Sequence, residues 1–203
     1  MEVLDMEPVN ILGLKLPTDP RWVNIAEKSI EDILIDHAYC EQKAASTCMS
    51  LIIRFFDKEE LVEQVSPIVA EEWAHFRRVL REMKKRGFKL KTPRKDEYVQ
   101  SLLDFRKTGV SRDDRLLDAL LICALIEARS CERFRLLSLY ITDDELKKFY
   151  HEFMVSEAGH YTLFIKLSET YFEKQKVRDR WQEFLEHEAE FLRTFKFRSD
   201  RFH

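Results

Sequence analysis

Apolar residues recur at every third or fourth position through four long stretches of this chain, with charged residues between them. That spacing is typical of helices that bury one face. Helix starts are indicated by Thr18-Asp19-Pro20, Ser66-Pro67, Ser111 and Thr142, and a helix end by Gly87. The predicted core helices span about 20–54, 67–86, 112–140 and 143–173, with shorter helices at about 58–65 and 95–107 and a peripheral one at about 177–195.

Glycine and proline are scarce, with four and five copies among 203 residues, while 35% of the residues are charged. So little turn-forming sequence favours an all-α fold, and the 45% hydrophobic content suits a single domain over residues 1–203. The N-terminus carries acids where a signal peptide needs basic residues, and no apolar run reaches the roughly 18 residues of a membrane span. We therefore expect a soluble, cytoplasmic protein without membrane contact.

Each of the four apolar stripes contains a glutamate near its middle. In the last core helix, Phe149 and Phe153 precede an acid and an imidazole, and Phe164 follows them. Positions three and four apart share one helix face, so these polar side chains are predicted to point into the core. The residues concerned in the four helices are Glu41, Glu72, His75, Glu127, Glu157 and His160.

These six residues form two matching sets. Glu41 precedes Glu72 by 31 residues, and Glu127 precedes Glu157 by 30. The two Glu-x-x-His tetrads are 85 residues apart, as expected if each set belongs to one helical hairpin. The spacing of three puts Glu and His about 60° apart in azimuth and about 4.5 Å apart in rise, so both can reach one ion.

Four carboxylates in one apolar core require compensation, because an unpaired buried charge costs several kcal/mol. Two divalent metals would supply four positive charges, with the imidazoles as neutral ligands. One Glu from each of two helices and one Glu-x-x-His from each of the others is the di-iron arrangement of ferritin-like bundles. The sequence therefore predicts a ferritin-like four-helix bundle with peripheral helices, holding two iron ions, with manganese as an alternative.

Simpler explanations also exist for the acids and histidines. A Glu-x-x-His match arises by chance about 0.7 times in a chain of this composition, so the tetrads could be surface or ion-paired groups. Glu132 is a rival ligand or second-shell candidate, but it lies off the inward stripe of its helix, which favours pairing with a nearby Arg. His37, one turn from Glu41, is a candidate second-shell hydrogen-bond partner or an ordinary core histidine.

Three strings around the predicted ligands carry a family resemblance: residues 36–46 (DHAYCEQKAAS), 126–134 (IEARSCERF) and 156–160 (SEAGH). Together with the Glu72-Trp-Ala-His75 tetrad, they resemble the bacterial tRNA 2-methylthio-isopentenyl-adenosine hydroxylases (MiaE-type) over nearly the whole chain. The resemblance implies a ferritin-like di-iron monooxygenase that uses dioxygen to hydroxylate the isopentenyl group beside the tRNA anticodon. It also implies the six ligands named above, acting in catalysis through the metal centre, and an external reductase or ferredoxin as electron donor.

A basic segment extends from Arg77 to Lys95, with one acid, Glu82, among ten basic residues. Its net charge is +9, so the rest of this −3 chain carries −12. Such segregation suggests a face for a polyanion such as tRNA, although lysines at a helix C-terminus also favour the helix dipole. The candidate tRNA contacts are Arg77, Arg78, Arg81, Lys84, Lys85, Arg86, Lys89, Lys91, Arg94 and Lys95.

Other functions share the ferritin-like scaffold. A ferroxidase or iron-binding protein needs no basic face. A peroxide scavenger of the rubrerythrin type would add a cysteine-ligated iron, but the four cysteines form no C-x-x-C pair. A non-catalytic bundle would bury ion pairs in place of metal. Metal content and tRNA binding distinguish these alternatives.

Overall fold

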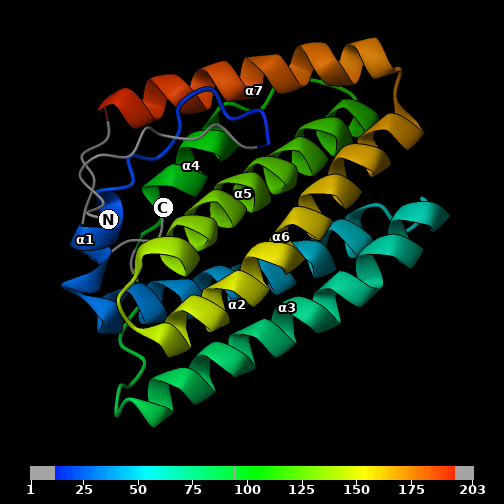
Figure 1. Ribbon diagram of the computed structural model, residues 1–203. Coiled ribbons are helices and arrows are strands. Elements are labelled where there is room, and N and C mark those ends of the chain that lie inside the picture. Colours follow the sequence, from blue (N-terminus) through cyan, green and yellow to red (C-terminus); the bar gives the residue numbers. More distant parts are fainter. Residues whose placement is uncertain (1–11, 94, 195–203) are drawn as a thin grey trace. The chain divides into compact units, whose positions relative to one another are not determined.

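The computed structural model describes residues 12–93 and 95–194, and within those ranges the regular secondary structure is all α-helical, with no strand (Figure 1). The chain divides into two compact units. Of the described residues, 28–93 and 95 belong to one unit, and 12–27 and 96–194 to the other. The helices are α1 (Trp22–Glu27), α2 (Ile30–Arg54), α3 (Glu59–Lys85), α4 (Glu97–Asp104), α5 (Arg112–Tyr140), α6 (Asp144–Tyr171) and α7 (Lys174–Thr194).

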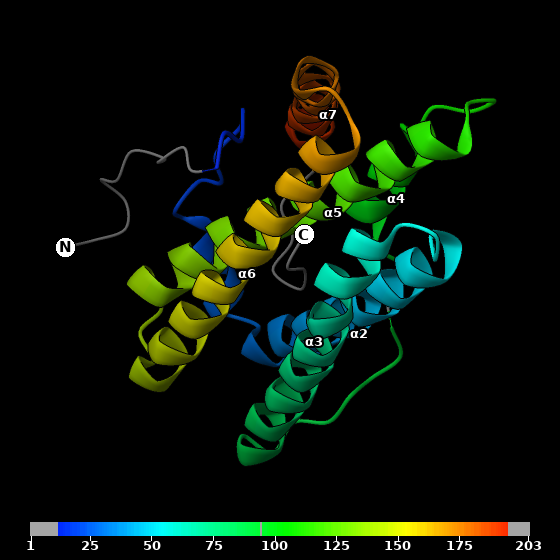
Figure 2. The ribbon, with the colours of Figure 1, turned by 90° about the vertical axis from the view of Figure 1, so that its right-hand side faces the viewer.

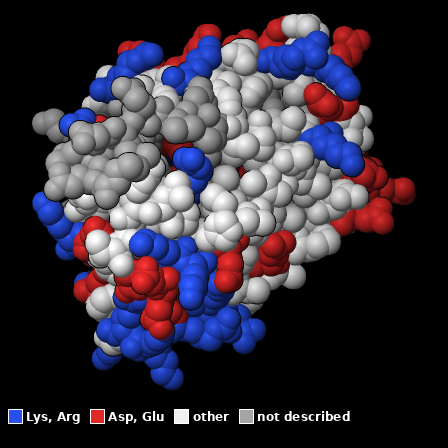
Figure 3. Space-filling view, in the orientation of Figure 1, with Lys and Arg blue, Asp and Glu red and all other residues white. Residues whose placement is uncertain are grey.

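The smaller unit is a hairpin of α2 and α3, which lie side by side (Figure 2). Each helix buries an apolar stripe, which includes Leu34 and Ala45 on α2 and Val65 and Val79 on α3. Acids occupy the first turn of each helix, and Lys84 and Lys85 the last turn of α3, as the helix dipole favours. Lysine and arginine side chains gather over that end of α3 (Figure 3).

Pro67 does not break the second core helix, so the predicted division into helices at about 58–65 and 67–86 is wrong. α3 runs unbroken from Glu59 to Lys85 with Pro67 inside it. A proline in a helix interior costs about 3 kcal/mol, because its amide cannot donate and its ring crowds the preceding turn. The apolar neighbours Val65 and Ile68 are both buried, and their burial offsets this cost.

The larger unit is built around α5 and α6, which pair along their lengths. α1, α4 and α7 also contact α5. The peripheral helix predicted at about 177–195 is α7, and it packs on α5 and α6 through residues such as Phe184 and Leu185. The predicted helix near 95–107 is the shorter α4.

The first predicted core helix, at about 20–54, is in fact two helices separated at Lys28 and Ser29. α1 belongs to the larger unit, where the buried Trp22 ring lies 5.4 Å from the guanidinium carbon of Arg133 on α5. α2 begins after Ser29, whose backbone is not helical. Packing of α1 on α5 thus outweighs the continuous helical periodicity of the sequence.

The predicted start of the third core helix is confirmed, whereas that of the fourth lies one residue later. Ser111 caps α5, and its hydroxyl accepts a hydrogen bond from the Asp114 amide at 3.0 Å. Asp143, not Thr142, caps α6 by accepting from the amides of residues 145 and 146. The acid at position 143 competes successfully, because a carboxylate also complements the helix dipole.

Three expectations are not tested by the fold. The single domain over residues 1–203 stays a prediction, as does the cytoplasmic location. The N-terminal acids within residues 1–11 and the candidate tRNA contact Arg94 lie outside the described residues. In the described part of the chain, no helix has the length and apolar character required to cross a membrane.

Candidate metal centre

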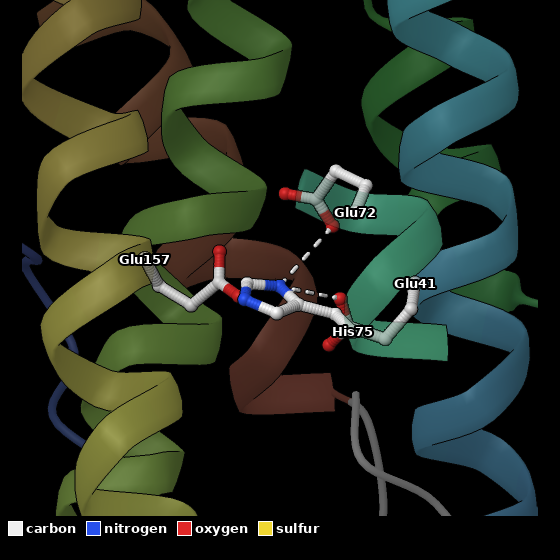
Figure 4. Close-up of side chains that lie close together, drawn as sticks. All are labelled: Glu41, Glu72, His75 and Glu157. Carbon is white, nitrogen blue, oxygen red and sulfur yellow. Dashed lines mark ion pairs between the residues drawn. The ribbon is translucent and has the colours of Figure 1, made fainter. Parts of the chain in front are cut away.

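Glu41 on α2 and Glu72 and His75 on α3 point toward one another within the hairpin (Figure 4). One oxygen of each carboxylate and one ring nitrogen all lie within 4.8 Å of each other. His75 Nδ1 is 3.3 Å from Glu41 Oε2 and 3.9 Å from Glu72 Oε2. The hairpin therefore brings together the first predicted set of residues, which we call the α2–α3 half-site.

The α2–α3 half-site is buried despite its charge. Glu72 and Glu41 expose only 1% and 4% of their surface, and the His75 side chain 11%. Glu72 and His75 lie on the stripe of α3 that also buries Ile68, and Glu41 lies on the stripe of α2 that buries Ala45, so helix periodicity places these acids in the core as predicted. Two buried carboxylates repel each other in a region of low dielectric, which favours a cation between them.

His37 on α2 supports this half-site from one turn before Glu41. It is fully buried, and its Nε2 donates a hydrogen bond to Glu41 Oε1 at 2.6 Å. Burial, followed by the nearby His75, lowers the pKa of His37 to about 3, so its imidazole is neutral. A neutral donor fixes the Glu41 carboxylate without cancelling its charge. This arrangement fits both interpretations of His37 from the sequence, a hydrogen-bond partner of a ligand and a hydrogen-bonded core histidine.

Glu41 shows that the half-site suits a cation. Among the described residues its carboxylate interacts with two imidazoles, those of His37 and His75, and with no lysine or arginine. Its Oε2 atom is buried and accepts no hydrogen bond. A buried acid in such surroundings needs positive charge from another source. Carboxylate and imidazole together are ligands that suit iron, manganese and zinc.

Glu127 on α5 and Glu157 and His160 on α6 form the corresponding group in the larger unit, the α5–α6 half-site. Their ligand atoms also lie within 4.8 Å of one another, and His160 Nδ1 is 3.3 Å from Glu157 Oε2. All three are buried, with 6%, 2% and 3% of their surface exposed. Each unit thus carries two carboxylates and one imidazole in the same helix-hairpin setting.

Glu132 lies apart from this chemistry, as the favoured interpretation of the sequence predicted. Its carboxylate accepts from Arg129 and from the backbone amide and hydroxyl of Thr18. The same Arg129 donates twice to Glu188 on α7, with both distances 2.8 Å. Arg129 and both acids are buried, so they form a compensated ionic network that joins α5 to α7.

Two buried acids were not singled out in the sequence. Glu188 lies on the apolar stripe of α7, and Asp118 on that of α5. Asp118 pairs with Arg180, whose Nε and Nη2 donate to its two oxygens at 2.7 and 2.9 Å. An acid on an apolar stripe would have identified both. That signal marks buried carboxylates in general, and the neighbouring cation decides which of them pair with arginine.

The basic segment lies in the smaller unit, and its side chains are only partly engaged. Arg86 pairs with Glu82, and Lys91 with Glu31. Four others are exposed and form no ion pair with the described residues: Arg77, Arg81, Lys84 and Lys89. Arg78 is half-buried, while Lys85 and Lys95 are exposed. No bound nucleic acid tests these residues, so their contact with tRNA stays a prediction.

Comparisons with known proteins found relatives over most of the chain. Residues 5–203 match the family described as tRNA-(MS[2]IO[6]A)-hydroxylase (MiaE). The tRNA 2-(methylsulfanyl)-N(6)-isopentenyladenosine(37) hydroxylase of Pseudomonas putida is 39% identical over 164 residues, covering 81% of this chain and 78% of that protein. The protein of the same name from Salmonella typhimurium is 26% identical over 239 residues, covering 92% and 87%.

One solved structure extends the likeness to the fold. It is a protein with aldehyde deformylating oxygenase activity from Synechococcus, 33% identical to this chain. The TM-score is 0.89, and the match covers 95% of this chain and 96% of the other. Together with the helical structure, this likeness confirms the predicted all-α, ferritin-like fold class.

Proposed function

This chain belongs to the MiaE family of tRNA hydroxylases, and we propose that it is a dioxygen-dependent di-metal monooxygenase acting on tRNA. Its substrate would be the 2-methylthio-N6-isopentenyladenosine of tRNA, which the names of its relatives give, and the family resemblance implies that the isopentenyl group beside the anticodon is hydroxylated. The observation that carries this proposal is the pair of buried half-sites, each with two carboxylates and one imidazole.

We assign the metal ligands to the two half-sites together: Glu41, Glu72, His75, Glu127, Glu157 and His160. Four carboxylates would neutralise two divalent ions, and the imidazoles would complete their coordination without adding charge. The likeness to the oxygenase and the match to the family both extend over all six of these residues, which supports their joint assignment as ligands. His37 would hold the Glu41 carboxylate in its ligating orientation.

We assign iron to this centre, with manganese as the alternative that the same ligands accept. When bound, a di-iron pair supplies the activation of dioxygen. One oxygen atom enters the substrate and the other leaves as water, which consumes two electrons from an external donor such as a reductase or a ferredoxin. The protein binds the ions, orients the prenyl group and excludes water. Buried Phe153 and Phe164, on the stripe that carries Glu157, suit that apolar group.

Metal analysis combined with a hydroxylase assay tests the assignment. Wild-type protein loaded with ferrous iron should hold two ions per chain and add oxygen to the modified adenosine, detected by mass spectrometry of digested tRNA. Glu72→Ala should lose metal and turnover while remaining helical. Glu63→Ala is the matched control, because Glu63 is an exposed acid of the same helix. Full hydroxylase activity in Glu72→Ala would contradict the ligand assignment.

The same assay separates the competing functions. A ferroxidase would oxidise ferrous iron and leave the tRNA nucleoside unchanged. A peroxide scavenger would consume peroxide without tRNA. Neither outcome is compatible with a tRNA monooxygenase.

The basic segment is the proposed tRNA-binding surface, and its contribution should depend on salt. Replacing Arg77, Arg81 and Lys84 by Gln should weaken tRNA binding and reduce the slope of log affinity against log salt by about 2. A charge-matched control replaces three exposed basic residues outside the segment, namely Lys148, Lys166 and Arg178. Equal losses in the two triple variants would show that net charge matters but the position of the segment does not.

A further inference from the structure

Trp73 lies between the predicted ligands Glu72 and His75 on α3, yet 47% of its surface is exposed. The chain has three tryptophans, and the other two, Trp22 and Trp181, are 2% and 9% exposed. Within α3, every residue of which the structure describes, Trp73 is the sole large apolar side chain that is exposed. Its position is one residue from a proposed ligand, a Cα–Cα step of about 3.8 Å.

The indole ring of Trp73 packs against the ring of Phe76. Its centroid lies 5.0 Å from that of Phe76, at an interplanar angle of 41°, and Phe76 is buried with 8% exposed. Aromatic pairs at this separation attract each other in tilted geometry. Phe76 therefore holds the indole against the helix while leaving part of it open to solvent.

A row of cations continues from Trp73 along α3. Arg77, Arg81 and Lys84 follow Trp73 at intervals of four, eight and eleven residues, which places all four side chains within about 80° of the helix circumference. The three basic side chains are exposed and form no ion pair with the described residues. An aromatic surface followed by a row of unpaired cations matches the alternation of base and phosphate in a single-stranded nucleic acid.

We propose that Trp73 is a stacking surface for an unpaired base of the tRNA anticodon arm, while Arg77, Arg81 and Lys84 bind the phosphates that follow it. This inference rests on the proposed function and adds a substrate contact to it. Stacking here would anchor the RNA one residue from Glu72, so that the prenylated adenosine is held close to the metal ligands. A protein partner fits less well, because protein interfaces need a larger apolar patch than one indole surrounded by charges.

Binding and turnover of an anticodon stem-loop carrying the modified adenosine test the proposal. Trp73→Ala should weaken binding about 5- to 150-fold, the range for losing one stacked base, and should raise KM with little change in kcat. Trp73→Phe should recover most of the affinity. The matched control is Phe56→Ala, an aromatic side chain of the same unit that is 75% exposed, and it should bind as wild type does.

Tryptophan fluorescence gives a second readout. Stacking of a base on Trp73 should quench emission when the stem-loop binds, and Trp73→Phe should abolish that quenching while retaining binding. Binding and KM equal to wild type in Trp73→Ala, with quenching unchanged in Trp73→Phe, would overturn the stacking inference. The proposed function would survive that result if Glu72→Ala were inactive. Conversely, a wild-type protein that binds the stem-loop through Trp73 but never hydroxylates it would refute the function and keep the contact.

Discussion

Replacing Glu72 by Gln should make the metal-free protein more stable than metal-free wild type. It should make the metal-bound protein less stable than metal-bound wild type. The substitution keeps the size of the side chain and removes one negative charge from the α2–α3 half-site. In the wild-type chain, Glu72 and Glu41 are both buried and offer oxygens no more than 4.8 Å apart. The new amide can donate a hydrogen bond to the Glu41 carboxylate, whereas the negative charge of Glu72 repels that carboxylate.

The size of the effect follows from that separation. Two unit charges 4.8 Å apart repel by about 3 kcal/mol at an effective dielectric constant of about 20. His75 lies within 3.9 Å of both carboxylates and relieves part of this repulsion when it carries a proton. We therefore expect a gain of about 1–3 kcal/mol in the metal-free protein, or about 3–10 °C in melting temperature for a chain of this length.

Thermal unfolding in chelator and in ferrous iron under nitrogen measures the change in melting temperature of the metal-free and the metal-bound protein. Iron should raise the melting temperature of wild type markedly and that of Glu72→Gln only slightly, because an amide is a poorer ligand than a carboxylate. Glu63→Gln, at an exposed position of the same helix, should follow wild type in both conditions. If metal-free Glu72→Gln melts at or below wild type, or if iron stabilises both proteins equally, the buried-anion reasoning is refuted.

Three further changes test the rest of the fold. Glu188→Ala should cost about 3–5 kcal/mol in urea unfolding by leaving a buried guanidinium underpaired, whereas exposed Glu190→Ala should change little. Pro67→Ala should stabilise the protein by about 1–3 kcal/mol, since it restores an amide inside α3; a loss of stability would contradict this. Burial and nearby acids raise the pKa of Cys131 to about 11, so at pH 8 iodoacetamide should alkylate half-buried Cys40 and spare Cys131 until urea is added.

Local signals predicted some helices closely and failed where packing between helices decides. α5 spans Arg112–Tyr140, as expected from its Ser111 cap and its apolar periodicity. No proline or glycine in the sequence indicates the break at Lys28 and Ser29. The break arises from the packing of α1 in the larger unit. Pro67 led to the prediction of a helix break that does not occur, because burial of its apolar neighbours stabilises α3.

The candidate site was more accessible to sequence reasoning than the helix ends. Helix periodicity alone places an acid on the inward face, and the nearly equal separations of 31 and 30 residues between each single Glu and the Glu-x-x-His tetrad that follows it add a second, independent constraint. The His37–Glu41 hydrogen bond also followed from their separation of four residues. By contrast, Arg180 approaches Asp118 across 62 residues, and no local pattern could reveal that pairing.

The buried acids have two kinds of basic partner, arginine and histidine. Glu132, Glu188 and Asp118 each bond to a buried guanidinium. The Glu132 pair lies within α5, whereas the Glu188 and Asp118 pairs connect α5 to α7. Glu41 is buried to the same degree, but imidazoles are its partners and one of them is held neutral by burial. An arginine fills the space between acids permanently, whereas imidazoles leave room for an ion and can ligate it. The chain therefore uses arginine where the acids join helices and histidine where they are predicted to bind metal.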